Sequence, residues 1–196
     1  MALAKQAKIL SKAQQDAVLG LLCSTRYPAR DRVIFLLSVR AGLRAKEIAA
    51  LKWGMVTDAE GELNDVIALT NEAAKGRRGG RAIPIAKDLK AALIALKAEA
   101  ANDYRKSPFV ITSERGLYTS SYAIVNKFAA WYGALGFTGA SSHSGRRTAI
   151  TNWARKISTV GGSLRDVQIL AGHSALSTTQ RYIEVDAGAM RRVVES

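Results

Sequence analysis

Apolar residues recur every three to four positions over most of this chain, which is the spacing of amphipathic helices. Ser11 is a suitable N-cap for the first of them, or its neighbour takes that place. Ser163 and Asp166 have the spacing of a capping box, and Gly172 is a natural left-handed stop for the same helix. We predict helices over residues 11–24, 28–41, 43–51, 87–101, 119–135, 143–157 and 163–172, a helix that carries Tyr182, and a last amphipathic turn or two over 187–195.

Three shorter runs between residues 54 and 85 have the composition of β-strands. They are Gly54–Thr57, Val66–Thr70 and Ala82–Ile85, and turn-rich segments separate them. Pro84 has no N–H to donate to a ladder, so the third strand is expected at an edge or ends there. The expected fold class is α+β and mainly helical, with a small three-stranded antiparallel sheet.

The length of 196 residues is enough for one well-buried core, and the sequence shows no internal repeat and no domain linker. We therefore expect a single domain over residues 1–196. Within it, residues 1–10 are expected to form an N-terminal extension and residues 186–196 a C-terminal tail.

The net charge indicates what kind of partner the protein binds. The chain has 29 basic and 16 acidic residues, which gives +13. A surplus of this size favours a polyanionic partner, and nucleic acid is favoured over membrane because no segment forms a basic amphipathic anchor. The simpler alternative is a basic surface that engages no partner.

Cysteine content and the N-terminus bear on the compartment. Cys23 is the only cysteine, so it excludes an internal disulfide and fits a reducing cytoplasm. Its apolar surroundings predict a small core residue rather than a nucleophile. The N-terminal residues do not form a signal peptide, and no stretch approaches the ~18 apolar residues of a membrane span. We expect a cytoplasmic protein.

The candidate chemistry is phosphodiester cleavage without a metal. Such cleavage needs positive charge on the non-bridging oxygens, a nucleophile, and a proton for the leaving oxygen. Arginine suits the first task because its planar fork binds two phosphate oxygens and keeps its charge. The chain has only two histidines, and we interpret its acidic cluster as a solvated turn, with a metal site as the alternative; the cluster comprises Asp58, Glu60, Glu62 and Asp65.

The polar residues that could perform these tasks lie in segments bounded by apolar helical pattern. His143 and Arg146 are spaced i, i+3, which places them on one helix face. His173 follows the helix stop at Gly172, where its alternative role is to cap that corner. Tyr182 supplies a hydroxyl nine positions later, although a tyrosine on a helix usually contributes packing.

A basic, glycine-rich hairpin supplies a further candidate. Lys75 can give up its proton to a leaving oxygen, whereas arginine cannot. We predict that the arginines of this hairpin and the arginine next to Arg146 contact DNA; they are Arg77, Arg78, Arg81 and Arg147.

Together these segments resemble the catalytic domain of the tyrosine recombinases, or phage integrase family, in the right order from about Leu10 to Val185. The matching blocks are AGLRAKEIAALKW, the basic hairpin that ends in AIPI, HSGRRT, and LAGHSALSTTQRYIEV. Gly145 departs from the family's usual leucine, and Arg147 from a frequent histidine. The resemblance implies that fold and six catalytic positions: Arg44, Lys75, His143, Arg146, His173 and Tyr182.

The resemblance further implies the mechanism of a site-specific recombinase. Tyr182 attacks the phosphate to give a 3′-phosphotyrosyl link, Arg44 and Arg146 hold the transition state, and no cofactor, metal or ATP takes part. It implies double-stranded DNA as partner, no membrane, and a homo-oligomer that is a monomer or dimer when free and a tetramer on paired sites. It also implies a nucleoid-associated protein of bacterial or phage origin. The C-terminal tail is expected to be exchanged between subunits, with a tail docked on its own subunit as the alternative.

Most members of the family have an N-terminal DNA-clamping domain ahead of this one, and only about ten residues precede the first helix here. We therefore expect a short member or a fragment. Integration, inversion, resolution and transposition stay open as the role. The alternatives in mechanism are a non-cutting DNA-binding module of the same fold and a nicking-closing enzyme of the type IB topoisomerase kind.

Overall fold

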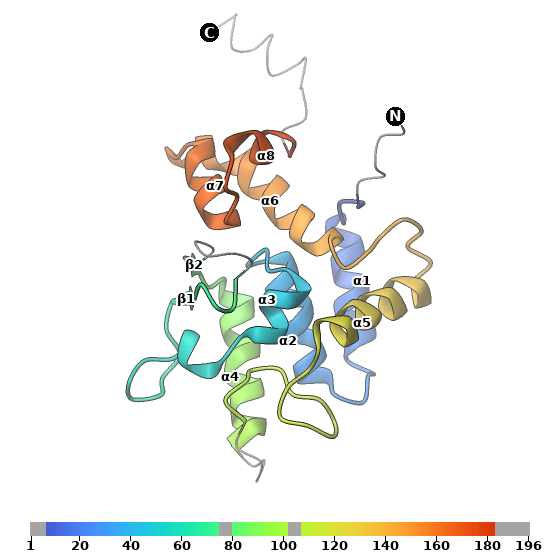
Figure 1. Ribbon diagram of the computed structural model, residues 1–196. Coiled ribbons are helices and arrows are strands. Elements are labelled where there is room, and N and C mark those ends of the chain that lie inside the picture. Colours follow the sequence, from blue (N-terminus) through green and yellow to red (C-terminus); the bar gives the residue numbers. More distant parts are fainter. Residues whose placement is uncertain (1–6, 75–79, 102–106, 183–196) are drawn as a thin grey trace, which may run out of the picture. The chain divides into compact units, whose positions relative to one another are not determined.

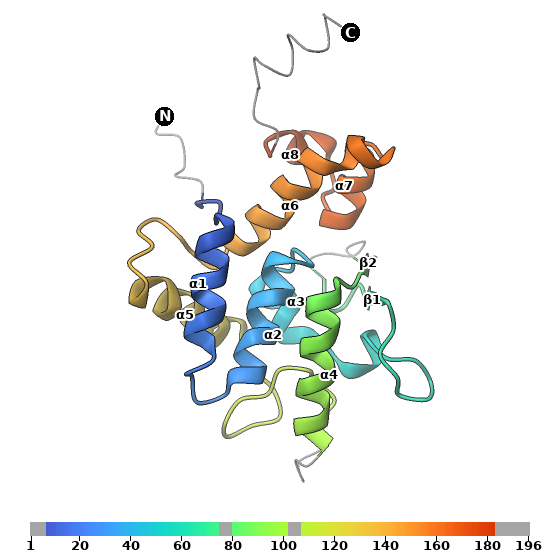
Figure 2. The same cartoon turned by 180° about the vertical axis from the view of Figure 1, so that it is seen from behind.

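The computed structural model describes residues 7–74, 80–101 and 107–182 (Figures 1 and 2). The chain divides into two compact units, Met1–Ala149 and Ile150–Ser196. The boundary falls inside helix α6 (Ser144–Lys156), which contributes its first turns to one unit and its remaining turns to the other. The single-domain organisation of residues 1–196 stays a prediction.

The fold class predicted from the sequence is confirmed, because the described chain is mainly helical with one small antiparallel sheet. The first unit contains α1 (Lys12–Leu22), α2 (Pro28–Val39), α3 (Ala45–Ala50), the 3-10 helix η1 (Trp53–Met55), β1 (Val66–Leu69), β2 (Arg81–Pro84), α4 (Lys87–Ala101) and α5 (Ser121–Ala134). The second contains η2 (Ile157–Val160), α7 (Leu164–Ala171) and α8 (Leu176–Gln180).

Local signals set most helix ends. Ser11 caps α1 in a full capping box with Gln14, and Ser163 caps α7 in another with Asp166. Gly172 ends α7 in the left-handed conformation, with φ 63°. These predicted caps are confirmed. The predicted turn over 187–195 lies outside the described residues.

The sheet has two strands in the part of the chain that the structure describes, so the predicted third strand over Gly54–Thr57 is wrong. Val56 N–H and Thr57 N–H both donate to the carbonyl of Trp53, which coils this run into η1. Thr57 instead forms an isolated bridge with Leu63, which lies outside the predicted second strand. The remaining two strands pair in register from Val66 opposite Pro84 to Leu69 opposite Arg81.

Helix α2 forms the centre of the first unit. Its residues 33–37 are all fully buried, so it is apolar on every side rather than amphipathic. It packs against α1, α3 and α4, and both views show it between α1 and α4 (Figures 1 and 2). This buried rod fixes the corner that follows it, where Gly42 adopts φ 63° and leads into α3.

The second unit has a smaller core of its own. Ile150, Val167 and Ala171 are fully buried, and Trp153 and Tyr182 pack against them. Tyr182 lies in the turn that follows α8 rather than on a helix, because α8 ends at Gln180. The expectation that a helix carries Tyr182 is corrected to this extent.

Cys23 is not a core residue, contrary to the expectation from its apolar surroundings. It is exposed at the C-cap of α1, and the neighbouring Leu22 takes the buried position. Among the described residues, the structure has no helix that is both long and apolar enough to cross a membrane.

Gly145 permits a close approach between α6 and α2. A Cβ atom at this position would lie 2.3 Å from Ser38 Oγ, 2.9 Å from Ser38 Cβ and 3.0 Å from Val39 Cγ1. Ser38 is fully buried, and its hydroxyl has no hydrogen-bond partner among the described residues. The space therefore holds hydrogen at residue 145 and nothing larger, and this contact sets the start of the helix that carries Arg146.

We expect Gly145→Ala to destabilise the fold by about 1–3 kcal/mol, because the added methyl overpacks the contact with Ser38. Urea unfolding followed by tryptophan fluorescence measures the change. Gly20→Ala is the matched control, since Gly20 lies in α1 with no atom within 4 Å of the added Cβ, and it should gain up to ~1 kcal/mol. An equal gain in both variants would contradict the close contact.

Candidate active site

Arg44 is the N-cap residue of α3, directly after the Gly42 corner. Its backbone is extended, with φ −76° and ψ 155°, and its side chain is 28% exposed. Leu43, which precedes it, is fully buried and donates its N–H to the carbonyl of Leu37, 3.0 Å away. The corner is thereby fixed on the core, and Arg44 extends from a rigid base.

Glu47 is the partner that organises this arginine. It occupies the third position of α3, where one carboxylate oxygen accepts the backbone N–H of Arg44 at 2.8 Å. The other oxygen accepts Arg44 Nη1 at 2.9 Å. The Glu47 side chain is 1% exposed, so the carboxylate end of these hydrogen bonds is shielded from solvent.

Two further arginines reach the same carboxylate. Arg81 makes a two-point contact, with Nη1 3.0 Å from Glu47 Oε1 and Nη2 3.2 Å from Oε2. Arg146 Nη1 lies 3.9 Å from Glu47 Oε2 and donates to the carbonyl of Gly42 at 2.5 Å. Arg44, Arg81 and Arg146 therefore share one anion, and we call these three residues with Glu47 the arginine cluster.

The arginine cluster changes the protonation of its carboxylate. Burial by itself raises the pKa of Glu47, but the hydrogen bond and charge of Arg81, together with the backbone hydrogen bond and charge of Arg44, outweigh it and lower the pKa below its ordinary value. Glu47 is therefore a carboxylate at neutral pH. An arrangement that holds a carboxylate among guanidinium forks also has the chemistry to hold a phosphate.

His143 and Arg147 lie at the start of α6. His143 is exposed one residue before the helix, and its carbonyl accepts the N–H of Arg147 at 2.9 Å. The side chain of Arg147 donates to the carbonyl of Ala7 at 2.9 Å. Lys75, Arg77 and Arg78 lie outside the described residues, so their predicted roles stay predictions.

His173 and Tyr182 lie together in the second unit. Their rings stack with centroids 5.6 Å apart and an interplanar angle of 23°. Two hydrogen bonds to Gln168 hold the backbone of His173 after the Gly172 turn. The His173 N–H donates to the Gln168 carbonyl at 3.1 Å, and the Gln168 side chain donates to the His173 carbonyl at 2.9 Å. His173 Nδ1 lies 2.9 Å from Thr179 Oγ1, and Thr179 is fully buried.

Sequence reasoning did not single out Glu47 or Thr179. Glu47 stands three residues after Arg44, which is the capping-box spacing with an arginine in the cap position, and that spacing was a usable signal. Thr179 gave none, because its contact depends on how α8 folds back toward His173. The acidic turn from Asp58 to Asp65 does not converge: within the described ranges, no three His, Cys, Asp or Glu side chains are grouped to hold a metal ion.

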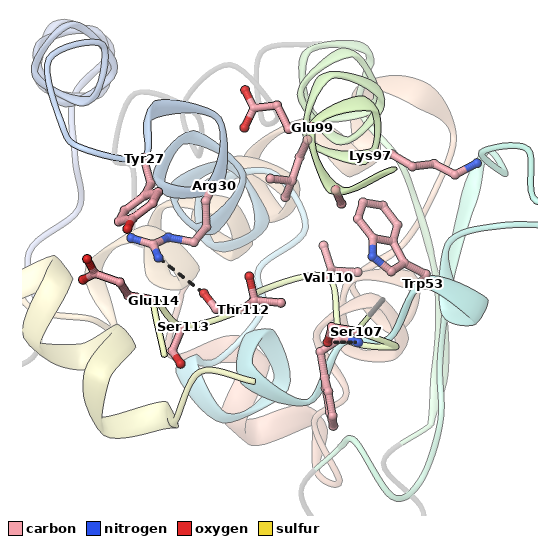
Figure 3. Close-up of a pocket in the computed structure, with 13 residues that line it drawn as sticks. Tyr27, Arg30, Trp53, Lys97, Glu99, Ser107, Val110, Thr112, Ser113 and Glu114 are labelled. Atoms are coloured by element: carbon pink, nitrogen blue, oxygen red, sulfur yellow. Dashed lines mark hydrogen bonds between the residues drawn. The ribbon is translucent and has the colours of Figure 1, made fainter. Parts of the chain in front are cut away.

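A separate pocket of about 430 Å³ lies elsewhere in the first unit (Figure 3). Trp53, Val110 and Phe109 are among its lining residues, and Arg30 crosses one end, with its guanidinium 4.2 Å from the centroid of the Tyr27 ring. Arg30 also donates to the Thr112 carbonyl at 3.3 Å. None of the predicted catalytic residues that the structure describes lines this pocket.

We expect Glu47→Gln to cost about 3–5 kcal/mol at neutral pH, because it leaves buried guanidinium groups without their anion. Folding lowers the pKa of Glu47, so its stabilisation is complete above the unfolded pKa of ~4.3 and is lost as pH falls through the lower folded value. The difference in the free energy of unfolding between the parent protein and the variant, measured by urea unfolding, should therefore be smaller at about pH 3 than at pH 7.

The control for this measurement is Glu60→Gln, on an exposed turn, which should change stability by less than ~0.5 kcal/mol at either pH. If the parent protein and Glu47→Gln differ in free energy of unfolding by the same amount at pH 7 and pH 3, the charge of the carboxylate is not what holds the cluster together.

We expect Thr179→Val to release the ring of His173, because it removes the hydroxyl at Nδ1 and keeps the shape of the side chain. For a hydrogen bond worth ~1 kcal/mol, the ratio of the hydrogen-bonded ring orientation to other orientations should fall about fivefold. Nitrogen chemical shifts of the His173 ring measure that ratio. Thr178→Val is the matched control and should leave the shifts in place.

Comparison with known proteins finds the family that the sequence motifs resemble. The Phage integrase family profile matches residues 8–188. Tyrosine recombinase XerA of Pyrococcus horikoshii is 28% identical over 196 residues, covering 96% of this chain and 62% of that protein. Tyrosine recombinase XerD of Xanthomonas axonopodis pv. citri is 30% identical over 188 residues, covering 89% of this chain and 57% of that protein.

Solved structures share the fold. The crystal structure of XerA recombinase superposes with a TM-score of 0.76 at 20% identity, covering 97% of this chain and 65% of that one. XerH site-specific recombinase, in a post-cleavage complex with a palindromic difH substrate, gives 0.74 at 20% identity, with 97% and 53% covered. This chain thus spans less than two thirds of each of these relatives. Because the family profile matches nearly its whole length, the chain belongs to the phage integrase family.

Proposed function

We propose that this chain is the catalytic part of a site-specific DNA recombinase that cuts and rejoins DNA through a 3′-phosphotyrosyl intermediate. The observation that carries the proposal is the arginine cluster, in which Arg44 and Arg146 both reach one buried anion. Membership of the phage integrase family supports the same assignment, since XerA, XerC and XerD tyrosine recombinases are among its relatives.

In the proposed reaction, Arg44 and Arg146 bind the non-bridging oxygens of the scissile phosphate. Tyr182 Oη attacks phosphorus in line, the bond from phosphorus to the 5′ oxygen breaks, and a 3′-phosphotyrosyl bond forms. His173 donates a hydrogen bond to a non-bridging oxygen as charge builds up there. The ring contact between His173 and Tyr182 supports their action at one phosphate.

Proton transfers complete the step. The phenol proton of Tyr182 leaves with the help of His143, and Lys75 protonates the departing 5′ oxygen. The new ester keeps the bond energy of the old one, so a 5′-hydroxyl from a second strand can reverse the reaction. We therefore propose that neither ATP nor a metal ion is consumed or required, because guanidinium groups supply the positive charge.

The proposed partner is double-stranded DNA, bound by a homo-oligomer that becomes a tetramer on paired sites. The net charge of +13 supports a polyanionic partner. Similar solved structures include DNA complexes, among them XerH site-specific recombinase bound to a difH substrate. The proposed setting is the nucleoid in the cytoplasm, and no membrane takes part.

We expect this protein to form a denaturant-resistant adduct with a nicked duplex that carries its recombination site, because loss of a short nicked strand traps the covalent link. Tyr182→Phe should abolish the adduct, since phenylalanine has no nucleophilic oxygen. Gel electrophoresis with labelled DNA detects it. Tyr122→Phe is the control, because Tyr122 is 74% exposed, and it should leave the adduct unchanged.

The result also separates the rival functions. DNA binding with no adduct on a cognate site would favour a non-cutting module and overturn the proposal. An adduct without exchange of strands between two duplexes would favour a nicking-closing enzyme of the type IB topoisomerase kind.

A further inference from the structure

We propose that Arg81 is a positioning residue for Arg44, acting through Glu47 rather than by touching DNA. This inference rests on the proposed function, because Arg44 is there a phosphate ligand. It also revises our prediction that Arg81 contacts DNA directly.

The contact between Arg81 and Glu47 is buried and bidentate. The side chains are 3% and 1% exposed, and each carboxylate oxygen accepts one guanidinium nitrogen. A two-point contact of this kind fixes the plane of the carboxylate as well as its position. The buried guanidinium of Arg81 therefore has little surface left to offer a DNA phosphate.

The orientation of the carboxylate determines where Arg44 lies, because both carboxylate oxygens accept hydrogen bonds from Arg44. Glu47 Oε2 holds the Arg44 backbone N–H, and Oε1 holds Arg44 Nη1. Of Arg44 and Arg81, only Arg44 is substantially exposed, at 28%. Arg81 thus acts from behind the carboxylate, and Arg44 presents the remaining donors toward a ligand.

Arg81 also joins two elements that are far apart in sequence. It is the first residue of β2 and pairs with Leu69 of β1, while Glu47 lies 34 residues earlier in α3. Just before it, Gly80 N–H donates to the side chain of Asn71 at 2.8 Å. This buried ion pair therefore fastens the base of the hairpin to α3.

Competition between the carboxylate and a phosphate for the donors of Arg44 is the second reason for the assignment. With Arg81 absent, the carboxylate would be free to turn toward Arg44 and compete with a phosphate for its donors. With Arg81 present, both carboxylate oxygens are shared, and Arg44 keeps a fixed direction. Misplacement of a reacting group by about 1 Å can cost on the order of 10²-fold in rate.

The test compares Arg81→Gln with Arg115→Gln, an exposed arginine of the same unit. We expect Arg81→Gln to slow adduct formation at saturating DNA by about 10²-fold. Measured in a Tyr182→Phe background, its duplex affinity should stay within about twofold, and its salt dependence should match that of the parent. Arg115→Gln should leave the cleavage rate unchanged, and Arg81→Lys should restore only part of it because lysine lacks the fork.

A direct phosphate contact by Arg81 predicts a different result. Arg81→Gln would then weaken binding, and the slope of log affinity against log salt would fall by about 0.9. That result would overturn the inference. So would additive losses in the Glu47→Gln, Arg81→Gln double variant, because a residue that acts through Glu47 has no further effect once Glu47 is changed.

A structural readout keeps the inference separate from the proposed function. The side-chain Nε–H resonance of Arg44 should shift and exchange faster in Arg81→Gln, and stay unchanged in Arg115→Gln. An unchanged Arg44 resonance overturns the positioning role, whether or not the protein cuts DNA. A parent protein that forms no adduct while Arg44 responds as expected would overturn the proposed function and leave the coupling established.

Discussion

One buried carboxylate, that of Glu47, is the constraint on which the rest of this site depends. Three guanidinium groups at close range repel one another, and without an internal anion they could not lie together in a protein interior. Glu47 supplies that anion and also caps α3 through the backbone of Arg44. The Glu47 side chain therefore both caps the start of α3 and pairs with the arginines. The same interaction stabilises the local fold and positions the proposed phosphate ligands.

Four of the catalytic candidates lie just outside a helix, whereas Arg146 lies within the first turn of α6. Arg44 is the N-cap of α3, His143 directly precedes α6, His173 follows the C-cap of α7, and Tyr182 follows α8. A residue just outside a helix is held by the rigid element behind it, yet its side chain is not committed to the helix surface. The pattern explains how short helices present precise chemistry in both units.

Buried contacts behind the site residues explain why their positions are fixed. Arg146 donates a hydrogen bond to the carbonyl of Gly42, and the close contact at Gly145 positions the start of the helix that carries it. His173 is held through Thr179 and Gln168. In each case a residue with no proposed chemical step determines where a proposed reacting group lies.

Sequence alone determined the helices with strong periodicity, their caps at Ser11, Ser163 and Gly172, and the family motifs, because these depend on local spacing. It failed at Gly54–Thr57, where local hydrogen bonds to Trp53 replaced a ladder, and at Cys23, where one step along a helix separates core from solvent. Only the tertiary structure decided that Arg81 faces Glu47 rather than solvent, since contacts 34 residues apart depend on how the elements pack, which no local pattern records.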